Sequence, residues 1–294
     1  MDWPKFRLTT STPSKLRTLL ILGRTSNLPT VWSNCLAGWW LGGGGNVLTL
    51  VQISVATTLM YLGGMFLNDA FDVAFDREHR KNRPIPSGVI TEREVWQWGL
   101  GLLVLGILAL VGLGKTTALL TLCLAGCILL YDAVHKAVSF APVLMAGCRF
   151  FLYLVAASVA TNGVTGNVVW CAVALASYIV GLSYLARKES IIGALPYWSA
   201  IFLTTPFIIA YYMDDDATRA PAYVILFILL VWIGWALHFT IGKNSPNIGA
   251  TVSRLLAGII LVDLLVLADK PVFWPLLALW FLLALLFQRF IPAT

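Results

Sequence analysis

The chain has 294 residues, of which 59% are hydrophobic and only 12% are charged, and its mean hydropathy is +0.83. This composition excludes an ordinary water-soluble domain of this size and predicts an integral membrane protein. The formal net charge of +6 is explained by basic loops that face anionic lipid headgroups, so we expect no nucleic-acid partner and expect membrane lipid as the surroundings.

Ten apolar segments are candidate membrane spans, since a helix needs roughly 20 mostly apolar residues to cross the hydrocarbon layer. In chain order they are residues 26–42, 47–71, 95–113, 116–134, 138–160, 166–186, 194–212, 221–241, 250–268 and 271–291. Prolines in the seventh and tenth segments leave nine spans plus a re-entrant or interfacial piece as an alternative. The expected fold is all-α: a single domain over residues 1–294, built as a polytopic membrane bundle of nine to ten transmembrane helices.

Lys and Arg residues are concentrated on one side of this predicted topology. The N-terminal tail, the loop after the second span and the later even-numbered span ends carry most of the 20 basic residues. Cytoplasmic loops are enriched in Lys and Arg. We therefore expect a multi-pass protein of the inner, cytoplasmic membrane with both termini in the cytoplasm.

The end of the second span and the loop after it read NDAFDVAFDREHRKNRPIPSG, residues 68–88. On a helix that turns 100° per residue, four oxygen-bearing side chains fall within an arc of about 100°. These are Asn68, Asp69, Asp72 and Asp76. Clustered carboxylates repel one another unless a cation neutralises them, and hard oxygen ligands on one face suit Mg²⁺. Arg77 and Arg83 follow directly and are placed to clamp phosphate groups; a solvated helix end with ordinary loop charges is the alternative.

This pattern, Asn68-Asp69-x-x-Asp72-x-x-x-Asp76-Arg77 followed by the loop RPIPSG at 83–88, resembles the first aspartate-rich motif of the UbiA superfamily of intramembrane prenyltransferases. The resemblance implies a helical bundle with a central cavity that opens laterally to lipid. It also implies Mg²⁺ as cofactor and transfer of a prenyl group from a prenyl diphosphate to a lipophilic acceptor, aromatic or not. By motif position, Asn68, Asp69, Asp72 and Asp76 would be the metal ligands, with Asp72 and Asp76 catalytic.

Other candidate site residues come from three further segments. Arg24 and Asn27 in LGRTSNLPTVW resemble the opening Arg-x-x-Asn of the family, although a positive-inside anchor and helix cap would also explain them. Lys136 in YDAVHK occupies the place of a diphosphate-binding basic pair of the family, which makes it a catalytic candidate, with a local Asp132–Lys136 pair as the alternative. Arg149 lies deep in a span and must face the bundle interior or water, which makes it a substrate-site candidate unless an ion pair with Asp132 accounts for it.

The second aspartate-rich motif of the family is expected after the sixth span, where this chain reads SYLARKESIIGALP, residues 183–196. The resemblance makes Glu189, its only acid, a catalytic candidate and makes Tyr184, Arg187 and Lys188 substrate-binding candidates. The missing acids argue against a second Mg²⁺ and leave open a catalytically impaired protein that binds or transports an isoprenoid or precursor. This variant resembles the bacterial EboC-like branch, which accompanies secondary-metabolite gene clusters.

Overall fold

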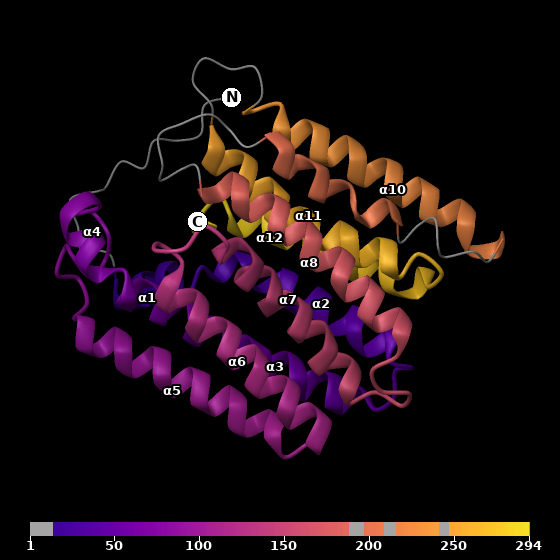
Figure 1. The fold of residues 1–294 in the computed structure, drawn as a ribbon, viewed down its shortest axis with the longest axis horizontal. Coiled ribbons are helices and arrows are strands. Elements are labelled where there is room, and N and C mark those ends of the chain that lie inside the picture. The colour runs from indigo at the N-terminus through magenta and orange to yellow at the C-terminus, as the bar shows by residue number, and fades with distance from the viewer. Residues whose placement is uncertain (1–13, 188–196, 209–215, 241–246, 294) are drawn as a thin grey trace.

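The structure is a computed structural model that describes residues 14–187, 197–208, 216–240 and 247–293. The described residues form helices and no β-strand, and the long helices run side by side as one bundle (Figure 1). In chain order the elements are α1 (Lys15–Leu22), η1 (Thr25–Asn27), α2 (Leu28–Leu41), α3 (Val47–Phe71), α4 (Val73–His79), α5 (Glu92–Val111), α6 (Lys115–Val134), α7 (Ala141–Ser158), α8 (Gly166–Arg187), η2 (Tyr197–Thr204), α10 (Asp216–Leu237), α11 (Ile248–Val266), η3 (Pro271–Phe273) and α12 (Trp274–Phe287).

Seven of these helices are long and apolar enough to cross a membrane: α3, α5, α6, α7, α8, α10 and α11. The expected first and tenth spans are the shorter helices α2 and α12, each of 14 residues, and the expected seventh span is represented by the eight-residue η2. The expected all-α membrane bundle is therefore confirmed. The expected nine to ten spans are not matched by full-length helices in the described part of the chain.

The outer helices carry their apolar side chains outward, as contact with lipid requires. Helices α5 and α10 lie at opposite edges of the bundle (Figure 1), and Leu105, Leu108 and Phe227 on them are exposed. Only 28% of the most apolar stretch of α5 is buried, against 72% in α11. Helix α11 is therefore the central helix of the bundle.

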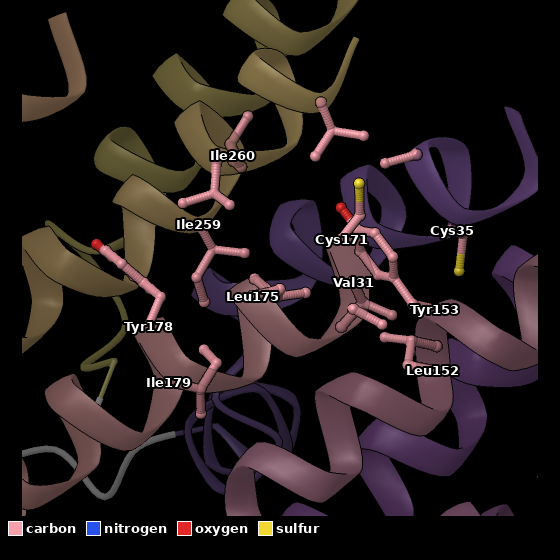
Figure 2. Packing of buried hydrophobic residues seen from close by; sticks show 14 of the residues in the cluster. Val31, Cys35, Leu152, Tyr153, Cys171, Leu175, Tyr178, Ile179, Ile259 and Ile260 are labelled. Carbon is pink, nitrogen blue, oxygen red and sulfur yellow. The ribbon is translucent and has the colours of Figure 1, made fainter. Parts of the chain in front are cut away.

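The core is built where α2, α7, α8 and α11 meet, and Figure 2 shows its apolar side chains pointing toward one another. Tyr153 of α7 and Tyr178 of α8 are fully buried, so their hydroxyl groups need partners. The Tyr178 hydroxyl donates to the carbonyl oxygen of Leu255 at 2.8 Å, and the Tyr153 hydroxyl donates to the carboxylate of Asp263. Both tyrosines thereby tie their helices to α11.

Glycines bring α3 and α5 into close contact. A Cβ atom built on Gly63 would lie 2.7 Å from the backbone nitrogen of Leu103, and one on Gly106 would lie 2.7 Å from the backbone oxygen of Ala56. Real Cβ atoms do not approach backbone so closely, so a larger residue at either place would push the helices apart. Small residues serve this role in membrane bundles because helix association in lipid depends on close packing.

Candidate active site

The acidic residues lie where α3 gives way to α4. Helix α3 ends at Phe71, Asp72 forms the junction, and α4 starts at Val73. Helical hydrogen bonds continue across the junction, from the Asp72 nitrogen to the Asn68 oxygen and from the Asp76 nitrogen to the Asp72 oxygen. The path is nearly that of one helix, so Asn68, Asp69, Asp72 and Asp76 stay on one side and all four are buried.

The RPIPSG loop returns a basic side chain to this acidic face. Arg83 places Nη1 2.7 Å from Asp69 Oδ1 and Nε 3.7 Å from Asp76 Oδ2, so it bridges the two carboxylates. The loop is anchored by Ile85, which is buried in a small apolar cluster with Phe66 and Val95. Arg83 is therefore positioned by its neighbour two residues further on, because buried Ile85 holds the loop against the end of α3.

Two more segments supply basic partners. Lys136 Nζ lies 2.7 Å from Asp72 Oδ1 and His135 Nε2 lies 3.3 Å from the same oxygen, and both residues follow directly after α6. Arg24 Nη2 lies 3.2 Å from Asn68 Oδ1 and 3.4 Å from an oxygen of Asp69. Arg24 has a positive φ of 41°, a conformation that non-glycine residues adopt rarely and that marks a constrained position.

The two aspartates among the catalytic candidates, Asp72 and Asp76, differ in their charge environment. Burial opposes ionisation of Asp72, but hydrogen bonds and charge from His135 and Lys136 outweigh it and lower the pKa of this carboxyl. Burial raises the pKa of Asp76, because Arg83 offsets only part of that effect and the neighbouring Asp72 adds repulsion. Of the two carboxylates, Asp76 is therefore the one whose charged form an added cation would stabilise more.

The donor set fits Mg²⁺. The Oδ1 atom of Asp76 is buried and has no hydrogen-bond partner among the described residues, and the other donors are hard carboxylate and amide oxygens. Within the described part of the chain, no three His, Cys, Asp or Glu side chains converge closely enough to form a metal cage. Magnesium in proteins commonly uses only one or two carboxylates together with water and substrate phosphates, so a full protein cage is not required.

A cavity of about 80 Å³ adjoins this cluster between α2, α3, α6 and α7. Its walls are mostly apolar, with Met60, Ile128 and Leu152 among them. Asp132 connects the two sites, because it lines the cavity and its Oδ1 atom accepts a 3.1 Å hydrogen bond from Asn68 Nδ2. Arg149 lines the cavity from α7 and donates to Asn34 and Thr30, so it is not ion-paired with Asp132.

The structure gathers part of the predicted set and disperses the rest. Around the cluster it brings together seven of the candidates: Arg24, Asn68, Asp69, Asp72, Asp76, Arg83 and Lys136. Arg77 pairs instead with Glu92 at 3.0 Å on an exposed surface, and Asn27 donates to the carbonyl oxygen of Ala293. Lys136 binds Asp72 and not Asp132, so the local pair is not formed.

The remaining candidates come from the region of the degenerate motif. The Tyr184 ring lies against Trp198, with centroids 5.0 Å apart, and Arg187 donates to the carbonyl oxygen of Val138. Lys188 and Glu189 lie outside the described residues.

Sequence reasoning missed His135 and Asp132 as members of the site. Both belong to YDAVHK, and their spacing of three residues on one helix was the signal that could have found them. It also missed Asn34 and Asp263, whose contacts join helices far apart in the chain.

Together, fold and site define a helical, multi-pass membrane protein with a buried cluster of acids and bases beside an apolar cavity. The family model described as the UbiA prenyltransferase family matches residues 27–190, and this chain belongs to that family. The resemblance of the 68–88 motif is thereby confirmed at the level of the family.

Curated relatives match a shorter region. Digeranylgeranylglyceryl phosphate synthase of Ignicoccus hospitalis is 37% identical over 103 residues, which are 35% of this chain and 34% of that protein. The enzyme of the same name from Methanopyrus kandleri is 30% identical over 110 residues, 37% of this chain and 38% of that protein. The chain thus spans about a third of the length of these relatives, and they do not place it in the EboC-like branch in particular.

Solved structures match over most of the chain. A UbiA homologue from Archaeoglobus fulgidus bound to GPP and Mg²⁺ has a TM-score of 0.61 at 15% identity and covers 84% of this chain and 99% of its own. A UbiA homologue from Aeropyrum pernix has a TM-score of 0.59 at 15% identity, and the match covers 85% of this chain and 98% of that homologue. At these identities the likeness concerns the fold.

Proposed function

We propose that this protein is a Mg²⁺-dependent prenyltransferase that moves a prenyl group from a prenyl diphosphate to a lipophilic acceptor inside the membrane. The observation that carries this proposal is the direct contact between Asn68 of the acid-and-base cluster and Asp132 of the apolar cavity. One substrate with a charged head and an apolar tail would reach from the cluster into the cavity. The Mg²⁺ and GPP of the Archaeoglobus homologue support the assignment.

The reaction would break the bond between the allylic carbon and the diphosphate oxygen, with the electron pair leaving on diphosphate. A nucleophilic atom of the acceptor would form the new bond to that carbon and lose its proton. Mg²⁺ held by Asp72, Asp76 and Asn68 would supply charge neutralisation for the leaving group. Arg24, Arg83 and Lys136 would bind and orient the diphosphate, since charge-assisted hydrogen bonds to phosphate are strong.

The apolar walls of the cavity have a second task. The allylic carbon becomes electron-deficient as its bond to oxygen breaks, and water would capture it. Met60, Ile128 and Leu152 offer no hydrogen bond to water and so disfavour it along their part of the wall. The cavity volume of about 80 Å³ accommodates only part of a prenyl chain, so the tail would continue toward lipid between the helices.

The direct test is turnover by the purified protein in detergent with labelled geranyl or geranylgeranyl diphosphate, Mg²⁺ and a panel of acceptors. We expect pyrophosphate and prenylated product from the wild type, and loss of both in Asp72→Asn and Asp76→Asn. Asp269→Asn is the matched control, because Asp269 pairs with Lys270 beyond the end of α11 and is not among the residues that line the cavity. Pyrophosphate release that survives unchanged in both site variants would overturn the metal-site assignment.

A binding or transport protein without turnover is the second candidate. The segment at 183–196 favours this candidate, because its single acid, Glu189, leaves few ligands for a second Mg²⁺. In that case the wild type would bind labelled prenyl diphosphate in a Mg²⁺-dependent manner, yet no acceptor in the panel would yield a product.

For the acceptor we retain two proposals that product analysis separates. The synthases of Ignicoccus and Methanopyrus support a glyceryl phosphate acceptor. The ARKES segment at 186–190 supports the EboC-like branch, secondary metabolism and an aromatic acceptor. Mass spectrometry of lipids that copurify with the protein, followed by assay of each candidate, distinguishes them.

We also propose that both termini face the cytoplasm. Ser26 and Asn27, directly before α2, contact the carbonyl oxygens of Pro292 and Ala293, the last described residues. The start of α2 and the last described residues therefore lie at the same side of the bundle, which supports an even number of crossings between them and so ten spans over nine. Reporter fusions at each terminus should report a cytoplasmic location, and a periplasmic signal from either one would overturn this topology.

A further inference from the structure

A second polar network lies within the bundle, separate from the aspartate cluster. Asp263 of α11 is completely buried and accepts hydrogen bonds from the Tyr153 hydroxyl and, at 2.7 Å, from Asn34 Nδ2. The side-chain oxygen of Asn34 in turn accepts a 2.8 Å hydrogen bond from Arg149 Nη1. Three helices, α2, α7 and α11, are thus joined by a chain of hydrogen bonds that ends on a guanidinium group.

The guanidinium of Arg149 reaches the cavity. Arg149 lines it together with Tyr61, whose ring centre lies 5.9 Å from the guanidinium carbon. Besides Asn34, its partners are the carbonyl oxygen of Thr30 at 3.3 Å and the hydroxyl of Thr30 at 3.0 Å. These contacts use three of the five N–H donors that an arginine carries, so two donors remain for a ligand.

All of these direct partners are neutral. Among the described residues no carboxylate forms an ion pair with Arg149, and Asn34 stands between it and Asp263. A cation at this depth costs free energy unless an opposite charge is near. Asp263 does not contact Arg149 directly, because Asn34 is hydrogen-bonded between them. The site can therefore accept a further anionic oxygen in direct contact.

The position of Arg149 argues against the diphosphate as that anion. Arg24, Arg83 and Lys136 already serve the acidic cluster near the ends of α3 and α6. Arg149 is the ninth residue of α7, roughly 12 Å along the helix from its first residue at 1.5 Å per residue. An anionic group there would belong to a different molecule from the one whose diphosphate lies at the acidic cluster.

We propose that Arg149 forms an acceptor subsite that binds a carboxylate or phosphate group of the acceptor, and that Asp263 and Asn34 are positioning residues for it. This inference rests on the proposed prenyl transfer. Asp263 lies outside residues 27–190, the part matched by the family model, so the subsite depends on a helix beyond that region. A carboxylate and a phosphate share the same recognition by a guanidinium fork.

The test compares anionic acceptors with neutral counterparts of similar size. The probes are 4-hydroxybenzoate against 4-hydroxybenzamide, and geranylgeranylglyceryl phosphate against geranylgeranylglycerol. Arg149→Gln should raise the KM for whichever anionic acceptor is used by about tenfold or more, because a charged hydrogen bond is lost. The KM for the prenyl diphosphate, the kcat and the KM for the neutral counterpart should change by less than about twofold.

The positioning residues and controls sharpen the result. Asp263→Asn should raise the same KM by a smaller factor, and Arg149→Lys should recover part of the loss, because it keeps the charge but not the fork. Arg289→Gln makes the same chemical change on an exposed residue and should behave as wild type. If Arg149→Gln raised the KM for the anionic and the neutral acceptor by the same factor, the subsite would be overturned while the proposed prenyl transfer would stand.

A binding assay keeps the two proposals separable if no product forms. The anionic probes should raise the thermal unfolding midpoint of the wild type and of Arg289→Gln, and should not raise that of Arg149→Gln. The neutral probes should shift none of them. Failure of the anionic probes to stabilise the wild type, or equal stabilisation of Arg149→Gln, would overturn the subsite whatever the turnover assay shows.

Discussion

Arg83 offers a sharp test of how the acidic face is held together. Its guanidinium contacts Asp69 at 2.7 Å and Asp76 at 3.7 Å, and its side chain is 23% exposed, whereas those of Asp69 and Asp76 are 7% and 2% exposed. In Arg83→Ala, Asp69 keeps Arg24 at 3.4 Å as a partner. Asp76 keeps no ion-pair partner among the described residues.

The expected cost is set by that unpaired carboxylate. Removing one partner of a fully buried pair costs about 3–5 kcal/mol, and the partial exposure of Arg83 reduces this to about 2 kcal/mol in the free energy of unfolding. For a chain of this size that loss would lower the midpoint of thermal unfolding by roughly 5 °C. The measurement is the midpoint of thermal unfolding, monitored by intrinsic fluorescence, with all variants in the same detergent and without Mg²⁺.

The double variant Arg83→Ala, Asp76→Asn decides whether the reasoning is right. It removes the carboxylate that Arg83→Ala leaves unpaired, so it should regain most of the lost stability. The double variant Arg83→Ala, Asp69→Asn should regain much less, because Asp69 still contacts Arg24 in Arg83→Ala. Equal midpoints for the two double variants would refute this account of the cluster.

Three further results are expected. Gly106→Ala should lower the free energy of unfolding by about 2 kcal/mol through overpacking against α3, whereas Gly101→Ala, with open space around it, should not; thermal unfolding compares them. Thr91→Ala should lower the free energy of unfolding by about 1 kcal/mol, because the Thr91 hydroxyl accepts from the Glu94 nitrogen and caps α5; Thr91→Ser keeps that hydroxyl and should unfold at nearly the wild-type midpoint. Lys136→Met should raise the KM for prenyl diphosphate by about tenfold in steady-state assays, because one charged contact is lost.

Two of the sequence predictions depended on local geometry and hold for that reason. Helix periodicity places residues four apart on the same side, so Asn68, Asp72 and Asp76 could be assigned to one face from their spacing alone. The break between α3 and α4 was not predicted, but it interrupts the helical path at a single residue and leaves the face intact. Long apolar segments likewise predicted the membrane helices, because burial in lipid requires length and hydrophobicity alone.

The partners of the charged residues could not be predicted in the same way. Arg77 and Arg83 belong to one short basic segment, yet Arg77 turns to Glu92 on the surface and Arg83 turns to the acidic face. Arg77 belongs to α4, whereas Arg83 lies in the loop that the burial of Ile85 anchors near the end of α3. Charge and spacing in the sequence do not contain that information.

The amino-acid sequence by itself determined the membrane class, the helical architecture, the family and the acidic face, because each follows from local periodicity, hydropathy or a contiguous motif. Only the tertiary structure decided which bases neutralise which acids, that Asp132 joins the cluster to the cavity, and that Asp263 holds Arg149 through Asn34. The hydrogen bonds of Asp132, Arg149 and Asp263 join residues 64, 115 and 229 positions apart. They exist because helix packing brings distant side chains within hydrogen-bond reach inside a bundle that offers buried polar groups no water.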